Sequence, residues 1–147
     1  MLSWSGGHGT IEAVHYDRVS KVVISSNQFL RSADHRGTNL PPNAPIIGVT
    51  MGNSSSDILL CNNLFVGMTQ QAVEVNSSGA INGCSGISVH NNSIDGAGLG
   101  GLGVAFGKCD GVSICGNQLR GAPIRSNGNA KNVLIQNNMT LHTAIPN

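Results

Sequence analysis

Few side chains of this 147-residue sequence could carry acid–base chemistry, because charged residues make up only 10% of it. Strand-like segments contain Glu12 and Glu74, and two carboxylates on one surface can act as a general acid and a general base. His90 is the best single candidate for proton transfer, since an imidazole titrates near neutral pH. Four further carboxylates are assigned to turns, and these are Asp17, Asp34, Asp57 and Asp110.

The cysteines and histidines do not have the spacing of metal ligands. Cys61, Cys84, Cys109 and Cys115 form no Cys-x-x-Cys pair, which zinc sites usually contain. The five histidines share no ligand spacing, and no predicted face gathers the three or more carboxylates of a Ca²⁺ site. We therefore predict no metal and no cofactor, and we expect the cysteines to be buried free thiols.

The composition argues against several classes of protein. The formal net charge is +1 and Lys and Arg form no cluster, which argues against a nucleic-acid partner. No apolar run approaches the roughly 18 to 20 residues that span a bilayer, so no membrane partner is expected. The first residues lack the basic and apolar regions of a signal peptide. We expect a protein that acts where it is made or leaves inside a particle.

Five segments repeat the pattern apolar-x-apolar-x-x-Asn-x-apolar. They are residues 22–29, 58–65, 87–94, 112–119 and 133–140, and only Thr140 departs from the last apolar position. The aligned asparagines are Asn27, Asn63, Asn92, Asn117 and Asn138, which follow one another by 36, 29, 25 and 21 residues. Apolar residues two positions apart predict strands. Short strands joined by a bend and repeated along the chain predict a β-solenoid.

A further strand is expected before each repeat, at residues 11–14, 47–51, 73–75, 104–106 and 124–125. Stacked coils share one apolar core, and the repeats predict five to six coils. Successive coils lie about 4.8 Å apart, so the amide of each aligned Asn can bond to the next and form a ladder. An Asn at each bend also tolerates a left-handed backbone. We predict an all-β solenoid with an Asn ladder.

Alignment of the repeats indicates which side chains point outward. The outward position of the further strand holds Glu12, Thr50, Glu74, Ala105 and Arg125. Two residues before each ladder Asn are Ser25, Cys61, His90, Cys115 and Gln136. Three residues after it are Leu30, Val66, Asp95, Arg120 and Leu141. The apolar members of this last row indicate that the face packs against another chain or a covering loop.

Two pairs of side chains should meet on adjacent coils. Asp95 and Arg120 could clamp a substrate, but we favour an ordinary surface ion pair. Cys84 and Cys109 share an inward corner position with other small residues, and the geometry there permits a disulfide. Stacked free thiols are favoured if the protein folds in a cytoplasm.

The Val-x-Ile-x-x-Asn repeat, the stacked asparagines and a shortest coil of 21 residues resemble the right-handed parallel β-helix of the pectin-lyase-like superfamily. The resemblance covers about residues 10–142. That superfamily contains polysaccharide lyases, hydrolases, epimerases and bacteriophage tailspikes, so the resemblance implies the fold and no single activity. Its enzymes usually have more coils. Residues 1–147 are therefore expected to be one β-helix domain that ends a longer solenoid or is capped by a partner.

The resemblance first implies a structural or host-attachment component of a bacteriophage virion, similar to a tailspike or fibre. Such a protein would be made in the host cytoplasm and assembled in the virion as a homotrimer or with capping virion proteins. It would contact polysaccharide of the host surface, and the candidate binding residues are Thr50, Asp95, Arg120 and Arg125. The short solenoid, the low charge and an aromatic content of 3% favour this function over catalysis.

The alternative is a polysaccharide lyase, hydrolase or epimerase, whose catalytic groups project from strand faces. Glu74 would act with Glu12 or with His90. Glu12 and Glu74 would lie two coils apart, about 10 Å at the Cα atoms, and inverting glycosidases hold their carboxyl groups about 6.5 to 9.5 Å apart. A glycan-binding module without catalysis is a third interpretation, which the scarcity of aromatic residues disfavours.

Overall fold

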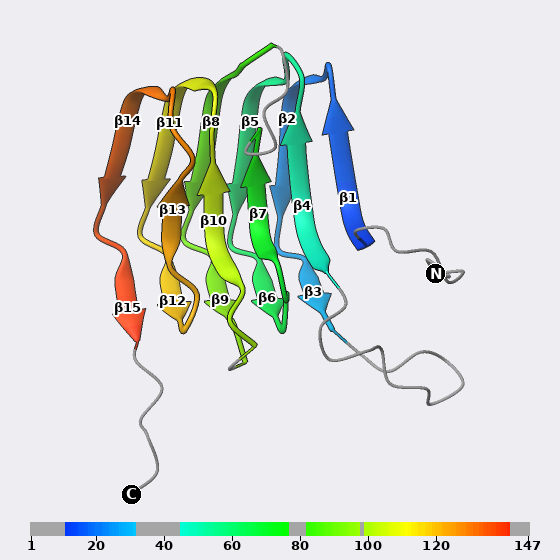
Figure 1. Ribbon diagram of the computed structural model, residues 1–147, viewed down its shortest axis with the longest axis vertical. Helices are drawn as coiled ribbons and strands as arrows, with labels where there is room; N and C mark the ends of the chain where they lie inside the picture. Colours follow the sequence, from blue (N-terminus) through cyan, green and yellow to red (C-terminus); the bar gives the residue numbers. More distant parts are fainter. Residues whose placement is uncertain (1–10, 32–44, 77–81, 98, 142–147) are drawn as a thin grey trace, which may run out of the picture.

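The computed structural model describes residues 11–31, 45–76, 82–97 and 99–141, without the side chain of Ile11. Every regular element among these residues is a β-strand. The strands form three parallel sheets of five, and each sheet takes every third strand of the chain (Figure 1). This arrangement confirms the prediction of an all-β, β-helix-like fold. We call each set of three successive strands a level, from the first (β1–β3) to the last (β13–β15).

Sheet A contains the strand that precedes each Asn repeat. Its strands, in spatial order, are β1 (Ile11–Asp17), β4 (Ile46–Gly52), β7 (Gln71–Val75), β10 (Leu102–Phe106) and β13 (Ile124–Ser126). All residues of β4 and β7 are buried, including those that face away from the core. Sheet A lies in front of the other strands in Figure 1.

Sheets B and C are formed by the two halves of the Asn repeat. Sheet B contains β2 (Ser20–Ser25), β5 (Ser56–Cys61), β8 (Cys84–His90), β11 (Cys109–Cys115) and β14 (Lys131–Gln136). Sheet C contains β3 (Gln28–Leu30), β6 (Leu64–Val66), β9 (Ser93–Asp95), β12 (Gln118–Arg120) and β15 (Met139–Leu141). The bend between the two sheets falls at the repeated Asn.

Inward side chains of the three sheets form one core. Residues that are at most 2% exposed come from every sheet, for example Val49, Val73 and Val104 of sheet A, Ile58, Ile87 and Val112 of sheet B, and Phe65, Ile94 and Leu119 of sheet C. The rings of Phe29 and Phe65 stack with centroids 4.6 Å apart and planes 6° apart. Burial of each large apolar side chain contributes about 1.5–3 kcal/mol, and no single level has enough neighbours to provide it alone.

The five repeated asparagines, which we call the Asn column, bond to one another at the bend. Both the main-chain N–H and the Nδ2 amide of Asn27 donate to Oδ1 of Asn63, at 2.9 and 3.2 Å. The same two bonds join Asn63 to Asn92, Asn92 to Asn117 and Asn117 to Asn138, at 2.9–3.0 Å. These bonds satisfy donors that would otherwise be buried without a partner.

The left-handed backbone at this bend belongs to a different residue from the one expected. Positive φ occurs one position before the Asn column, at Ser26, Asn62, Asn91, Gly116 and Asn137, with φ between 53° and 68°. The column asparagines are not among the residues with positive φ. The turn of the backbone is therefore made by the preceding residue, and each column Asn is free to use its side chain and N–H for the bonds between levels.

Candidate functional site

Sheet A presents two outward rows of side chains on its outer face. Strand pairing aligns His15, Thr50, Glu74, Ala105 and Arg125 in one row. It aligns Glu12, Ile47, Gln71 and Leu102 in the other. The first row has one residue on each of the five strands and the second has one on each of the first four, and the two residues on a strand are three positions apart.

The expected place of Glu12 in the row of Thr50 and Glu74 is wrong. Glu12 pairs with Ile47, and His15 occupies the position opposite Thr50. Strict alternation fails because these strands turn two consecutive residues inward between the outward ones, as Ala72 and Val73 show in the core of β7. The sequence of β1 contains two apolar-x-apolar pairs, Ile11 with Ala13 and Val14 with Tyr16. The second pair is the one that aligns with Val49 and Met51 of β4.

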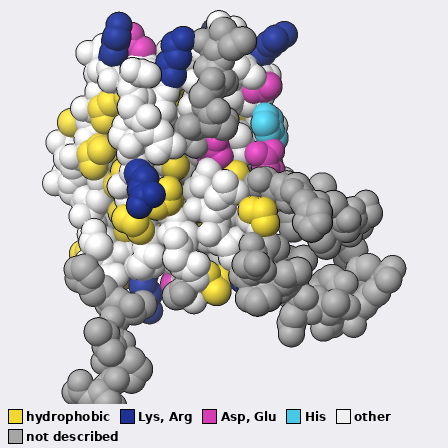
Figure 2. All heavy atoms as spheres, viewed as in Figure 1, with side chains coloured by type: hydrophobic (Ala, Val, Ile, Leu, Met, Phe, Trp, Pro, Cys, Tyr) yellow, Lys and Arg dark blue, Asp and Glu magenta, His cyan; other side chains and the backbone are white. Residues whose placement is uncertain are grey.

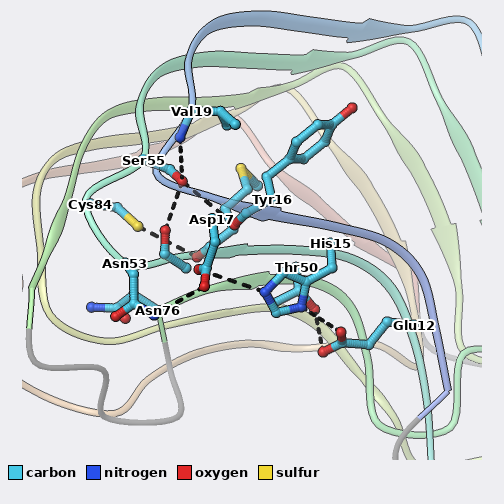
Figure 3. A network of polar contacts seen from close by, with 12 residues as sticks. Glu12, His15, Tyr16, Asp17, Val19, Thr50, Asn53, Ser55, Asn76 and Cys84 are labelled. Atoms are coloured by element: carbon cyan, nitrogen blue, oxygen red, sulfur yellow. Dashed lines mark hydrogen bonds and ion pairs between the residues drawn. The ribbon is translucent and has the colours of Figure 1, made fainter.

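The carboxylate of Glu12 connects the two rows. Its Oε1 accepts a hydrogen bond of 3.0 Å from Thr50 Oγ1, and its Oε2 bonds to Nδ1 of His15 at 2.5 Å (Figure 3). The other ring nitrogen of His15, Nε2, lies 3.6 Å from Oδ1 of Asp17. The hydrogen bond to Glu12 raises the pKa of His15 above its ordinary 6.5, and the charges of Glu12 and Asp17 act in the same direction against partial burial.

Glu74 lies deep in the same face. The residue is only 4% exposed, and its Oε2 accepts a hydrogen bond of 2.5 Å from Nε2 of Gln71, one row away on the same strand. Gln71 is itself buried, at 5% exposure. The amide therefore fixes the orientation of the carboxylate.

A groove of about 370 Å³ lies over these rows. The described residues that line it are mainly polar and include both glutamates: Glu12, His15, Ile47, Thr50, Gln70, Gln71, Glu74, Leu102, Ala105 and Asn127. No Lys or Arg occurs among these described lining residues. The groove has the volume of an ordinary small-molecule site, which is about 300–1,000 Å³. It offers carboxylate and amide acceptors, amide donors and a hydroxyl.

The other candidate residues lie elsewhere. Arg125 continues the outward row on β13 but does not line the groove. Asp95 and Arg120 are opposite each other in sheet C, as expected from the repeat, with Arg120 Nε 3.9 Å from Asp95 Oδ2. Their side chains are 34% and 55% exposed, so the pair contributes less than about 1 kcal/mol.

His90 lies on the outer face of sheet B, away from the groove. Its Nε2 is 2.9 Å from Oγ of Ser113, and that oxygen is 3.3 Å from Sγ of Cys115. The strand register places His90 between Cys61 and Cys115, as the alignment predicted. Among the described residues, no group of three or more metal-ligating side chains is found. His8, Asp34, His35 and His142 lie outside the described residues.

The inward cysteines are register partners without a bond between them. Cys84 and Cys109 face each other on β8 and β11, both are buried, and all four cysteines are free. Each inner thiol contacts a carbonyl, that of Met51 for Cys84 and that of Gly107 for Cys109. Burial raises the pKa of the Cys84 thiol and raises that of Cys109 to about 11, from an ordinary value of 9.0.

Several groove residues were not found from the sequence. These are His15, Gln70, Gln71 and Asn127. The signal was present in the spacing, because Glu12 with His15 and Gln71 with Glu74 repeat a polar pair three residues apart at the same point of two levels. A search for period two alone does not detect it.

Comparisons with protein-family models, with curated proteins and with solved structures find no match for this chain. Within the described part of the chain, no helix is long and apolar enough to cross a membrane.

Proposed function

We propose that this chain is a polysaccharide-recognition protein, a β-helical component similar to a bacteriophage tailspike or fibre, and that the groove on sheet A holds a segment of the glycan. In this proposal the fold is a right-handed parallel β-helix of the pectin-lyase-like kind, with about five coils and an Asn ladder. The observation that carries the proposal is the groove over the two outward rows of sheet A, whose lining contains Glu12, Thr50 and Glu74 on three adjacent strands.

The chemistry of the groove favours a sugar as its occupant. A glycan presents hydroxyl groups along one face, and each can donate to a carboxylate while accepting from an amide. Gln70, Gln71 and Glu74 provide such donors and acceptors close together. Two carboxylates without a lining Lys or Arg would repel an acidic sugar. We therefore expect a neutral segment of the host polysaccharide.

The groove by itself would bind weakly. Its described lining contains no aromatic ring for a sugar face to stack on. Several grooves acting together raise the apparent affinity about 10²–10⁴-fold without any new contact. The proposed homotrimer, with its three grooves directed at one surface, would supply that multivalency.

The test is titration of the protein with neutral and with uronate-containing oligosaccharides. Gln70 is exposed and lines the groove, so Gln70→Ala should weaken binding of the neutral glycan about three- to tenfold with the thermal midpoint unchanged. Gln118→Ala on β12 is the matched control, since Gln118 is also exposed but lies in sheet C. Equal effects of the two variants, or tighter binding of the uronate glycan, would contradict the proposal.

A second candidate is hydrolysis of the bound glycan, favoured by the presence of two glutamates in one groove. One carboxyl group would protonate the leaving-group oxygen, while the other would accept a proton from the water that attacks the anomeric carbon. Glu74→Gln and Glu12→Gln would then each abolish release of reducing ends. Wild-type protein that binds the glycan without releasing reducing ends excludes hydrolysis and leaves the binding proposal intact.

A further inference from the structure

The last level of the stack exposes residues whose register partners in the second, third and fourth levels are buried core residues. Val133 and Ile135 of β14 are register partners of Val112 and Ile114. The latter pair is 1% and 0% exposed, whereas Val133 and Ile135 are 39% and 47% exposed. In Figure 1 this level is at the left, and Figure 2 shows hydrophobic side chains on that side of the molecule. Among the described residues, none packs over the outer side of this last level, and we call its apolar surface the end face.

Two outward rows are apolar at both ends of the stack and polar in the middle. The row on sheet B contains Val23, Leu59, Ser88, Ser113 and Leu134. The row on sheet C contains Leu30, Val66, Asp95, Arg120 and Leu141. Val23 and Leu134, at opposite ends, are 65% and 47% exposed. A first level placed on the end face would bring these two side chains together, and would do the same for Leu30 and Leu141.

The Asn column has a direction that the two ends share. Each of the first four column asparagines donates through its N–H and Nδ2 to Oδ1 of the next column Asn along the chain, so the bonds all run from Asn27 towards Asn138. Among the described residues, nothing donates to Oδ1 of Asn27. At the other end, Asn138 donates through Nδ2 to the carbonyl of Ile114, and its N–H has no acceptor in the described part of the chain.

If the first level of another copy is placed on the last level, Asn27 of that copy comes next to Asn138. The N–H of Asn138 would then donate to Oδ1 of Asn27, which continues the column in the same direction. The sheets are parallel throughout, so the outer edges of the first and last levels, which pair with no other described strand, are complementary in strand direction as well. In sheet A such a stack would place Arg125 of β13 in register with His15 of β1, so the fit between the two levels comes from the apolar rows and the Asn column and not from opposite charges. The alternative contact, between the end faces of two copies, would place their strands antiparallel and would bring identical rows together.

We propose that the end face docks the first level of a second copy of this chain, so that copies stack head to tail along the solenoid axis. The contact between two copies would use the same strand pairing and the same core rows as the contact between two levels of one copy. Because the two surfaces are different, the association does not close on itself, and it grows into filaments as the concentration rises. This stacking is independent of the glycan proposal and of side-by-side trimers.

The test is native mass by light scattering and sedimentation over a range of concentrations, with electron microscopy of the largest species. Leu134→Lys and Ile135→Lys introduce a charge at exposed positions of the last level, so the monomer should keep its strand content. Each should weaken association at least about tenfold, since one buried apolar contact is lost and a charge is desolvated. Ser93→Lys, at an exposed position of the middle level, is the matched control and should assemble like wild type.

A covalent trap reports the orientation. The double variant Val23→Cys/Leu134→Cys should form a series of disulfide-linked multimers under oxidation, whereas each single variant should give at most dimers. A monomer at every concentration would overturn the proposal. So would a closed dimer or trimer whose mass is the same for wild type and Ile135→Lys.

Discussion

Asn92 accepts two hydrogen bonds from Asn63 at one oxygen atom, its Oδ1, which lies 3.0 Å from both the main-chain nitrogen and Nδ2 of Asn63. The Nδ2 of Asn92 in turn donates to the carbonyl of Leu60. One buried side chain thus joins two levels and holds the bend between sheets B and C. The repeated Asn is more than a turn-forming residue, because its amide replaces the strand pairing that the bend interrupts.

Substitution of a middle Asn of the column should be costly. Asn92→Ala removes the acceptor of the main-chain N–H of Asn63 and one of the two acceptors of its Nδ2, which keeps its bond to the carbonyl of Ile24, and it also removes the donor to the carbonyl of Leu60. Each buried polar group that loses its partner costs about 1–3 kcal/mol. We expect a loss of about 2–5 kcal/mol in the free energy of unfolding, measured by urea denaturation. Asn27→Ala is the control, because Asn27 is exposed and no described residue donates to its Oδ1. Equal losses for the two variants would show that the column bonds are not what stabilises the bend.

The residue before each column Asn should be sensitive to backbone geometry alone. Asn91 has φ 53° and is exposed. Asn91→Gly should keep or slightly raise the thermal midpoint, whereas Asn91→Val should lower the stability by about 1–2 kcal/mol, since a β-branched residue resists the left-handed region. The same pair of substitutions at Ser93, in a regular strand, should give the opposite order. An Asn91→Val protein as stable as wild type would contradict the bend geometry.

The cysteines should separate into two pairs by reactivity. Alkylation of the native protein near pH 8 should label Cys61 and Cys115 first, because Cys84 and Cys109 are buried and have raised pKa values. All four should be labelled after denaturation without reductant. The pKa of Cys109 is about 11 in the fold and 9.0 when exposed. Its contribution to stability is therefore complete below pH 9 and is lost as the pH rises towards 11.

Fewer than four reactive thiols in the unreduced, denatured protein would show that a disulfide forms. Cys84 and Cys109 would then be its members, because they are register partners on adjacent strands. Rapid labelling of all four native thiols would instead contradict the inward corner position of this pair.

His15 should titrate above its ordinary pKa of 6.5 because of its hydrogen bond to Glu12. Glu12→Gln should move the pKa of His15 down towards 6.5, as measured by NMR of the ring protons. Asp17→Asn should lower it less, since Asp17 is 3.6 Å away and its effect is smaller. A folded-state pKa that is raised stabilises the protein below pH 6.5, and this stabilisation is lost as the pH rises through the folded value. An unchanged pKa of His15 in Glu12→Gln would contradict the hydrogen bond by which Glu12 connects the two rows.

Sheets B and C could be predicted in register from the sequence, because one polar residue marks the same bend in every repeat. The neighbours of His90 and the pairing of Asp95 with Arg120 followed directly from aligning the asparagines. Sheet A has no such marker. Apolar-x-apolar pairs occur twice in β1, and nothing local distinguishes the alignment through Ile11 from that through Val14.

The groove was only partly predictable for the same physical reason. Glu74 and Thr50 were assigned correctly to one row, whereas His15 was missed and Glu12 was misplaced. Close packing accompanies the two consecutive inward positions of β4, because a Cβ atom at Gly48 would lie 2.7 Å from the ring of Phe65. Contacts of this kind join residues far apart in sequence, so periodicity does not reveal them.

The most direct test of the account is to follow the amide NMR signals of the ¹⁵N-labelled protein during titration with a neutral oligosaccharide from a candidate host polysaccharide. Recognition in the groove predicts the largest shifts in β4 and β7, around Thr50, Gln71 and Glu74, and small shifts in sheets B and C. Shifts confined to sheet B around His90 or to sheet C around Asp95 would contradict the groove as the binding site, as would binding of the oligosaccharide with no shift in sheet A.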